Sequence, residues 1–356
     1  MKRHYFLGGN TTKGFYSYYD YLLGPKEANK IYAIKGGPGT GKSTLMKKVA
    51  RWADGRDYDI DYLHCSSDPD SLDGVIVRDI GIAMVDGTSP HIVDPINPGC
   101  VDTILHMGEF WNETAIRERK DNIIACNTDI KRYFTRAYHY IGAAGEFYRD
   151  IMEINQGCLS EAAVLDAASK LTAGKSKISG RIGTVRKLFL TAISPLGVIG
   201  FPNSFAYPAV YVLKARIAGG SGRVLEKTAR YFTENGYDIE CFYDPLSPQD
   251  NILHMTVPQE GIFITTDDFF TKYPTGNTGT VIDLDAMLDS AAVQRAETDL
   301  QESRELVNTM VDRAVTVIKK AKSTHDQLEQ NYVPYMDFER INLFQEQVLR
   351  DIERFI

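Results

Sequence analysis

The feature that most constrains the fold of this 356-residue chain is a pattern that occurs twice. Residues 30–48 read KIYAIKGGPGTGKSTLMKK, and residues 210–227 read VYVLKARIAGGSGRVLEK. In both stretches an apolar run precedes a glycine-rich turn, and the residues after the turn have a helical pattern. A strand, a tight turn and a helix in this order are typical of α/β sheets. The sequence therefore predicts two such sheets, one after the other.

Further matches follow one another in the same order in both halves of the chain. The pairs are Lys35 and Lys214, Arg51 and Arg230, 58–60 and 237–239, 81–82 and 261–262, 92–94 and 281–283, and 5–7 and 188–190. Most of these pairs are separated by 179 or 180 residues. Ordered matches of this kind indicate an internal duplication.

A long helical pattern follows each predicted sheet. Apolar residues recur at spacings of three and four between Ile123 and Ala144 and again between Val307 and Leu328. This pattern is typical of helices that pack along a seam, so we expect the arms to pack against each other or against the sheets. The alternative is that the arms bind a protein partner or mediate self-association. Pro334 is expected to interrupt the second pattern, because proline lacks the N–H group that a helix interior requires.

The bulk composition argues against several classes of protein. A net charge of −7 disfavours general binding to nucleic acids or membrane surfaces. No apolar run approaches the roughly 18 residues that a membrane span needs, and the N-terminus is not typical of a signal peptide. The five cysteines and seven histidines are scattered without metal-ligand spacing, so we expect neither disulfides nor a zinc site. These features predict a protein of the reducing cytoplasm.

The first glycine-rich turn matches the phosphate-loop motif G-x-x-x-x-G-K-[ST] at every position. Glycines let main-chain N–H groups approach phosphate oxygens, and the following helix presents its positive dipole end to the same anion. Lys42 is expected to reach the β- and γ-phosphates, and the Ser43 hydroxyl to bind Mg²⁺. The predicted cofactors are ATP and Mg²⁺. The predicted nucleotide-binding residues are Gly36, Gly37, Pro38, Gly39, Thr40, Gly41, Lys42, Ser43 and Thr44.

An aspartate at the end of an apolar strand normally supplies a second metal contact. Asp86 closes the apolar segment 81–86 and is the predicted second Mg²⁺ ligand, although an ordinary Asp-Gly turn also explains it. Gly87 stands where many ATPases have a glutamate that polarises water. Its presence predicts slow hydrolysis or a base supplied from elsewhere.

Three more carboxylates lie in a loop predicted for 66–74, after a strand predicted for 60–65. Asp68, Asp70 and Asp73 either face the γ-phosphate, because ligands bind at strand ends of open α/β sheets, or are solvated turn residues. Asp68 joins Lys42 and Asp86 as a catalytic candidate.

The second glycine-rich turn lacks the groups that phosphoryl transfer needs. The aligned pairs are Lys42 with Ser221, Ser43 with Gly222, Thr44 with Arg223, and Asp86 with Thr266. These replacements remove most of the charge stabilisation, so the second site is predicted to be degenerate. Arg216 and Arg223 suggest the hypothesis that one of them serves the first site as an arginine finger or holds another phosphorylated ligand.

We therefore expect a P-loop NTPase domain with a helical arm over 1–172, a basic linker over 173–187, and a degenerate P-loop NTPase-like domain with its own arm over 188–356. The letters GKS at 174–176 belong to the linker, because no strand precedes them. The predicted fold class is α/β: duplicated, mostly parallel P-loop NTPase-like sheets, each followed by a long helical arm.

Five segments together resemble an uncharacterised bacterial family of tandem P-loop ATPases, described as predicted ATPases or nucleotide-kinase-like proteins. They are GGPGTGKSTLMKKVA, SSDPDSLDG, GIAMVDGTSPHIVDP, and the paired openings HYFLGG and KLFLTA. The resemblance covers essentially the whole chain and implies ATP binding by the first half. AGGSGR in the second half departs from GTGKST, so the resemblance does not imply two active sites.

Three functions fit these observations. The leading one is Mg²⁺-dependent ATP hydrolysis, coupled to the arrangement of the helical arms. A nucleotide or small-molecule kinase is the second, and a non-catalytic ATP-binding module that recruits a protein partner is the third. The base preference stays open. A kinase would need a basic lid, for which the candidates are Arg117, Arg119, Lys120, Lys131, Arg132 and Arg136, residues that otherwise form the polar face of an arm helix.

Overall fold

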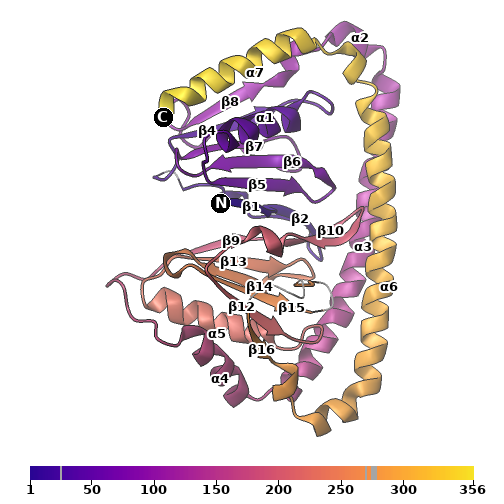
Figure 1. Ribbon diagram of the computed structural model, residues 1–356. Helices are drawn as coiled ribbons and strands as arrows, with labels where there is room; N and C mark the ends of the chain where they lie inside the picture. Colours follow the sequence, from indigo (N-terminus) through magenta and orange to yellow (C-terminus); the bar gives the residue numbers. More distant parts are fainter. Residues whose placement is uncertain (25, 269–270, 274–278) are drawn as a thin grey trace. The chain divides into compact units, whose positions relative to one another are not determined.

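The computed structural model describes residues 1–24, 26–268, 271–273 and 279–356 (Figure 1). It is an α/β protein with mixed sheets of mostly parallel strands and with long helices. In the described ranges, no helix combines the length and the apolar character that crossing a membrane requires. The α/β class expected from the sequence is confirmed at this level.

One six-stranded sheet has the order β1-β5-β6-β7-β4-β8. Its strands are β1 (Lys2–Tyr5), β4 (Lys30–Lys35), β5 (Ile60–Cys65), β6 (Asp68–Val77), β7 (Ile82–Asp86) and β8 (Asp102–His106). Strand β6 is antiparallel to β5 and β7, whereas the other neighbouring pairs are parallel. The strands predicted for 60–65 and 81–86 correspond to β5 and β7.

The other six-stranded sheet repeats this arrangement. Its strands are β9 (Val185–Leu188), β12 (Ala209–Lys214), β13 (Ile239–Asp244), β14 (Ser247–Val257), β15 (Ile262–Asp267) and β16 (Thr280–Asp283). The order β9-β13-β14-β15-β12-β16 has one antiparallel strand, β14, at the position that β6 occupies in the first sheet. Two smaller sheets pair β2 (Gly8–Thr11) with β3 (Gly14–Ser17) and β10 (Thr191–Ser194) with β11 (Gly197–Gly200).

The helices connect and cover these sheets (Figure 1). They are α1 (Lys42–Asp54), α2 (Glu113–Arg117), α3 (Lys120–Cys158), α4 (Glu161–Thr172), α5 (Ser221–Glu234), α6 (Ser290–Glu329) and α7 (Phe338–Ile352). Short 3₁₀ turns include Tyr19–Tyr21, Met107–Phe110 and Val333–Tyr335. Pro334 therefore lies between α6 and α7, at the interruption that the sequence predicted.

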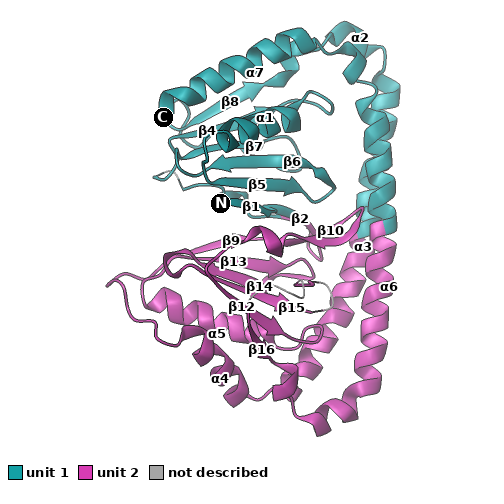
Figure 2. Cartoon of the chain, viewed as in Figure 1, with its two compact units in different colours: residues 1–8, 17–137, 316–356 teal, residues 9–16, 138–315 magenta. Residues whose placement is uncertain are grey.

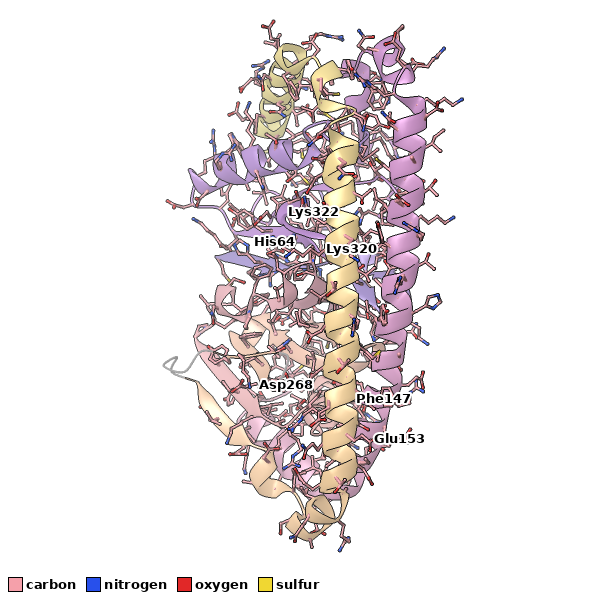
Figure 3. All side chains as sticks on the ribbon, turned by 90° about the vertical axis from the view of Figure 1, so that its right-hand side faces the viewer. His64, Phe147, Glu153, Asp268, Lys320 and Lys322 are labelled. Carbon is pink, nitrogen blue, oxygen red and sulfur yellow. The ribbon has the colours of Figure 1, made fainter. Side chains whose placement is uncertain are left out.

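The two long helices, α3 and α6, contain the predicted apolar seams and lie side by side (Figures 1 and 3). The Ser303 hydroxyl of α6 donates a 2.6 Å hydrogen bond to the Asp150 carboxylate of α3. Most seam positions are buried because apolar side chains three and four residues apart share one helix face. The buried ones are Ala137, Ile141 and Ala144 in α3, and Val307, Val311, Ala314, Ile318, Ala321 and Leu328 in α6.

The chain forms two compact units, each with one six-stranded sheet (Figure 2). Unit 1 comprises residues 1–8, 17–137 and 316–356, and unit 2 comprises residues 9–16 and 138–315. Helices α3 and α6 each contribute one part to each unit. The compact units divide the chain differently from the domains predicted over 1–172 and 188–356. Strand β9 begins inside the stretch predicted as the basic linker 173–187.

The core of unit 1 forms where α1 and α7 pack on its sheet. Helix α1 buries Leu45, Met46 and Val49 because these residues recur on one helix face. Helix α7 adds Ile341 and Val348 to the same cluster of buried side chains. Thus residues from the C-terminus complete the core around the glycine-rich turn.

Two expectations about local structure are wrong. The segment 66–74, predicted as a loop, is mostly strand: β6 begins at Asp68 and pairs with β5 through an irregular register near His64 and Cys65. Polar residues obscured it, because carboxylates are normally depleted in strands. The match of 92–94 with 281–283 also fails, since 92–94 lies outside the strands and the structural counterpart of β16 is β8.

Candidate phosphate-binding site

The phosphate-loop sequence forms a tight turn between β4 and α1. Gly39 (φ +68°) and Gly41 (φ +83°) have left-handed backbone conformations, which residues with a Cβ adopt only with strain. Gly41 is the N-cap of α1, and the helix begins at Lys42 without a side-chain cap. The predicted order of strand, glycine turn and helix N-terminus is confirmed.

Main-chain donors gather in this turn. In the part of the chain that the structure describes, no group accepts a hydrogen bond from the main-chain N–H of Gly39, Thr40, Gly41, Lys42, Ser43 or Thr44. The last three belong to the first turn of α1, where the helix dipole adds partial positive charge. A cluster of such donors at a helix N-terminus binds anions.

Lys42 and Asp86 lie together, as the sequence predicted. The Lys42 ammonium donates to the main-chain carbonyls of Gly36 at 3.0 Å and Gly37 at 2.9 Å. Its Nζ is also 3.5 Å from Oδ2 of Asp86, and both side chains are largely buried. Asp86 reaches this position because β7 pairs in parallel with β4, which places Asp86 opposite Ile34.

The other predicted metal ligand, Ser43, faces a different strand. Its Oγ accepts a 3.0 Å hydrogen bond from the main-chain N–H of Leu72 in β6. Thr44 is exposed on the first turn of α1. A hydroxyl of Thr88, which sequence reasoning did not single out, donates to the Gly36 carbonyl at 3.1 Å, and the Thr88 N–H donates to Asp86 at 2.8 Å.

The third catalytic candidate, Asp68, interacts with α6. Its Oδ2 accepts a 2.8 Å hydrogen bond from the Ser71 hydroxyl and lies 3.5 Å from the Lys322 ammonium. Figure 3 labels Lys322 on α6. The described partners of Asp68 are thus distinct from those of the Lys42–Asp86 pair. Asp70 is exposed, and its main-chain carbonyl accepts from Lys47.

A partly buried polar cluster lies beside these residues, and the sequence pointed only to its one buried member, Asp73, as one of three carboxylates. Its other members are Tyr19, Cys65 and His91. The Tyr19 hydroxyl is 2.9 Å from Nδ1 of His91, and Nε2 of His91 is 3.6 Å from Oδ2 of Asp73. Burial raises the pKa of Asp73, and the nearby Asp86 charge adds to this, while His91 and Lys42 act in the opposite direction. No local sequence signal joins these residues, because they come from separate segments.

The C-terminal segment covers one side of the glycine turn. A Cβ added to Gly39 would lie 2.6 Å from Cγ2 of Val333, and one added to Gly37 would lie 3.2 Å from the Trp111 ring. The Trp111 ring in turn contacts the Tyr332 ring, with centroids 6.1 Å apart. Close packing of this segment therefore disfavours a side chain at both glycines, and the backbone conformation disfavours one at Gly39 as well.

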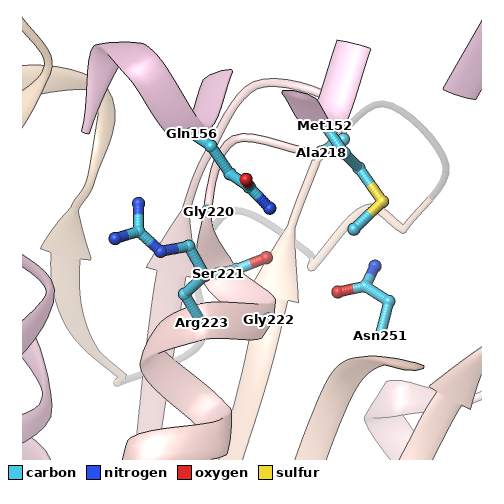
Figure 4. Close-up of a pocket in the computed structure, with 8 residues that line it drawn as sticks. All are labelled: Met152, Gln156, Ala218, Gly220, Ser221, Gly222, Arg223 and Asn251. Carbon is cyan, nitrogen blue, oxygen red and sulfur yellow. The ribbon is translucent and has the colours of Figure 1, made fainter. Parts of the chain in front are cut away.

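The glycine-rich turn of unit 2 also precedes a helix, but the side chains around it are different (Figure 4). Gly220 has φ +91° and caps α5, which begins at Ser221, as Gly41 caps α1, which begins at Lys42. Strand pairing places Thr266 opposite Leu213, as Asp86 is opposite Ile34.

Little room remains at this second turn. Its cavity of about 30 Å³ has space for about one water molecule and is lined by Met152, Gln156, Ala218, Gly220, Ser221, Gly222, Arg223 and Asn251. A Cβ on Gly222 would lie 1.9 Å from Oδ1 of Asn251. The turn also satisfies some of its own donors, since the N–H groups of Gly219 and Arg223 bond to carbonyls within it.

The two arginines of this turn have partners within unit 2. Arg216 lies 3.3 Å from the Asp285 carboxylate, and Arg223 donates to Glu161 at 2.9 Å and to the Leu159 carbonyl at 2.8 Å. The hypothesis that either one serves the first site stays a prediction.

The basic residues proposed as a kinase lid lie on α2 and α3 or between them, and all six are exposed. Arg117 pairs with Glu113 at 2.8 Å, and Arg119 donates to the Tyr335 hydroxyl at 3.1 Å. These contacts are typical of a polar helix face.

The donors around the first turn fit a nucleotide with Mg²⁺. Main-chain N–H groups and an ammonium suit phosphate oxygens, and the hydroxyl of Ser43 and the carboxylate of Asp86 are the hard oxygen ligands that Mg²⁺ prefers. A Cβ on Gly36 would lie 2.9 Å from both the Met107 Cβ and the Thr40 hydroxyl, so this close turn requires glycine there too.

Comparison with protein-family models, curated proteins and solved structures found no match. The geometry of the site therefore carries the functional argument.

Proposed function

We propose that unit 1 binds ATP together with Mg²⁺ at residues 36–44 and hydrolyses the nucleotide. The observation that carries the proposal is one turn with unpaired main-chain N–H groups and the Lys42–Asp86 pair at its base. This combination supplies donors for phosphate, a mobile cation and an oxygen ligand for a metal.

The residues of the turn have separate roles in this proposal. The N–H groups of the turn and of the first helical turn hold phosphate oxygens. Lys42 exchanges the carbonyls of Gly36 and Gly37 for phosphate oxygens, which are stronger acceptors because they are charged. Ser43 and Asp86 would hold Mg²⁺, which neutralises phosphate charge when bound. Since Gly87 follows Asp86, we expect slow turnover.

We further propose that the two halves are copies of one P-loop NTPase-like unit, with one competent and one degenerate site. The shared strand order, the left-handed glycines before α1 and α5, and the equivalent positions of Asp86 and Thr266 support the proposal. Random similarity rarely preserves order, direction and register together.

The test measures nucleotide binding and phosphate release by the purified full chain with Mg²⁺ and ATP. We expect Lys42→Ala to lower phosphate release at least 100-fold, because removing one charge-stabilising group typically costs 10²–10³ in rate. Ser221→Ala is the matched control at the equivalent helix start of unit 2 and should leave the rate unchanged.

The same assay separates the alternatives. ADP that forms only after an acceptor is added would indicate a kinase. Tight ATP binding without turnover under any condition would indicate a non-catalytic module. Absence of ATP binding to the wild-type protein would refute the proposal.

A further inference from the structure

Three metal-ligating side chains from separate segments converge in unit 1. Cys65 ends β5, Asp73 lies within β6, and His91 follows β7. The Sγ atom, a carboxylate oxygen and a ring nitrogen all lie within 4.8 Å of one another. The antiparallel pairing of β5 with β6 brings the first two together, and the chain after β7 adds the histidine.

The spacing of His91 and Asp73 suits coordination better than hydrogen bonding. Their nearest atoms, Nε2 and Oδ2, are 3.6 Å apart, which is too long for a hydrogen bond. Metal–ligand bonds of about 2.0–2.1 Å at tetrahedral angles place neighbouring ligand atoms about 3.3 Å apart. The observed separation requires only a small movement to reach that geometry.

Asp73 has an oxygen without a hydrogen-bond partner. The residue is 6% exposed, and among the described residues nothing donates a hydrogen bond to its Oδ2. Burial of such an oxygen costs free energy unless a cation or a donor satisfies it. This is an independent indication that a ligand belongs at the cluster.

Tyr19 provides the outer contact that histidine ligands usually have. Its hydroxyl lies 2.9 Å from Nδ1 of His91. If Nδ1 carries the proton and donates to Tyr19, the lone pair of Nε2 faces Asp73. Partners of this kind orient a histidine ring and set its tautomer for metal binding.

We propose that Cys65, Asp73 and His91 bind one divalent transition-metal ion, for which Zn²⁺ is the expected occupant. Thiolate and imidazole ligands favour Zn²⁺, whereas Mg²⁺ takes oxygen ligands in an octahedral arrangement. Three protein ligands leave one coordination position for water or a substrate atom. The proposal does not depend on nucleotide binding, although Asp73 interacts electrostatically with Lys42 and Asp86.

The protonation state of the thiol makes binding depend on pH. A metal binds the thiolate, so it displaces the proton of the Cys65 thiol. We expect affinity to rise with pH and binding to release protons into a weakly buffered solution.

A second group of possible ligands, His325, Asp326 and Glu329, provides a comparison. It lies along one face of α6, and Asp326 already pairs with Lys322. Acidic groups on exposed helix faces are common without a metal, so this group carries no proposal.

The experiment titrates the full chain, after treatment with a chelator, with Co²⁺ as a spectroscopic substitute for Zn²⁺. We expect visible bands of a tetrahedral ion and a near-ultraviolet thiolate-to-metal band that saturates at one equivalent and is abolished by competing Zn²⁺. Cys65→Ser should remove the thiolate band. Asp73→Asn and His91→Gln should each weaken binding more than 100-fold, because loss of an outer-shell partner alone typically costs 10–100-fold. Tyr19→Phe removes only the outer contact of His91, so it should weaken metal binding about 10–100-fold.

Cys100→Ser, at an exposed cysteine of the same unit, and His325→Gln are the matched controls and should bind like the wild type. Circular dichroism and thermal unfolding establish that each variant is folded. A thiolate band that persists in folded Cys65→Ser, or no saturable Co²⁺ binding by the wild type, would overturn the proposal. ATP hydrolysis is not part of the readout, so the test stands if the nucleotide proposal fails.

Discussion

The ammonium of Lys42 lies 3.5 Å from the carboxylate of Asp86, although 44 residues separate them in sequence. The pair forms because β4 and β7 are parallel neighbours whose carboxyl ends meet at one edge of the sheet. The pair places the predicted metal ligand, Asp86, beside the N-terminus of α1.

The role of this pair can be tested at Asp86. On the proposed function, Asp86→Asn should lower Mg²⁺-dependent phosphate release about 100-fold or more, because it removes a metal ligand while retaining shape. Stability should fall by only about 1 kcal/mol, since Lys42 keeps its two carbonyl acceptors. Asp94→Asn removes an exposed partner of Lys35 and is the control for charge loss. Equal rates in both variants would contradict the assignment.

Gly39 should be intolerant of a side chain for two separable reasons. Its φ of +68° strains any residue with a Cβ, and that Cβ would lie 2.6 Å from Val333. We expect Gly39→Ala to destabilise the protein by about 2–4 kcal/mol in denaturant unfolding, combining backbone strain with overpacking. The same change made in a Val333→Ala background should cost less unfolding free energy, because the close contact is gone. The loss that remains, measured against Val333→Ala alone, is the backbone strain.

Gly99 provides the matched comparison for this prediction. It has φ +78° but nothing within 4 Å of an added Cβ. Gly99→Ala should therefore show only the strain of a left-handed residue, about 1–2 kcal/mol. If Gly39→Ala is no more harmful than Gly99→Ala, the close packing of Val333 on the turn is incorrect.

Restoring the motif letters in unit 2 should not create a second site. The double variant Ser221→Lys, Gly222→Ser places a Cβ 1.9 Å from the Asn251 amide oxygen, inside a buried network with Asp244 and Tyr148. We expect loss of about 1–3 kcal/mol of stability and no gain in bound nucleotide. Equilibrium dialysis with ATP measures the second quantity. Binding of a second equivalent of ATP would contradict this prediction. It would show that only the residue types at 221 and 222 prevent nucleotide binding at this turn.

Acid should destabilise the protein partly through His254. Burial lowers the pKa of this residue to about 3, and its Nε2 has no hydrogen-bond partner among the described residues. His254 therefore takes up a proton near pH 6.5 in the unfolded chain but stays neutral in the folded chain. As a result, the stability of the fold falls as the pH drops below that value. The expected loss between pH 7 and pH 5 is about 2 kcal/mol.

The variant His254→Gln isolates this contribution. Between pH 5 and 6.5, the unfolding free energy of this variant should change less with pH than that of the wild type. The difference in slope corresponds to at most one bound proton. Above pH 7 the two curves should run parallel, because the histidine is neutral in both states. Parallel curves throughout would mean that His254 is protonated in the folded protein.

Much of the first site was predictable because its residues are neighbours in sequence. The glycine spacing and the helical pattern after Lys42 located the turn and α1, and the apolar run before Asp86 located β7. The sequence also predicts the contrast with Ser221 and Thr266, which lie at a helix start and a strand position like those of Lys42 and Asp86. Asp68 follows β5 as the sequence predicts, but the polar residues at the start of β6 do not give the pattern of a strand.

Other parts of the site depend on contacts between distant segments. The scattered cysteines and histidines predict no zinc site, whereas strands β5 and β6 and the chain after β7 place Cys65, Asp73 and His91 together. Likewise, the Tyr32 hydroxyl donates to Asp351 across 319 residues, in the packing that places the C-terminal helix against the first sheet. The spacing of residues in the sequence shows only which residues of one strand or helix share a face. It does not show which segments pack together. The sequence by itself determined the turn and its charge. Strand pairing and the packing of α7 and Val333, which bury apolar surface from both ends of the chain, decided what surrounds it.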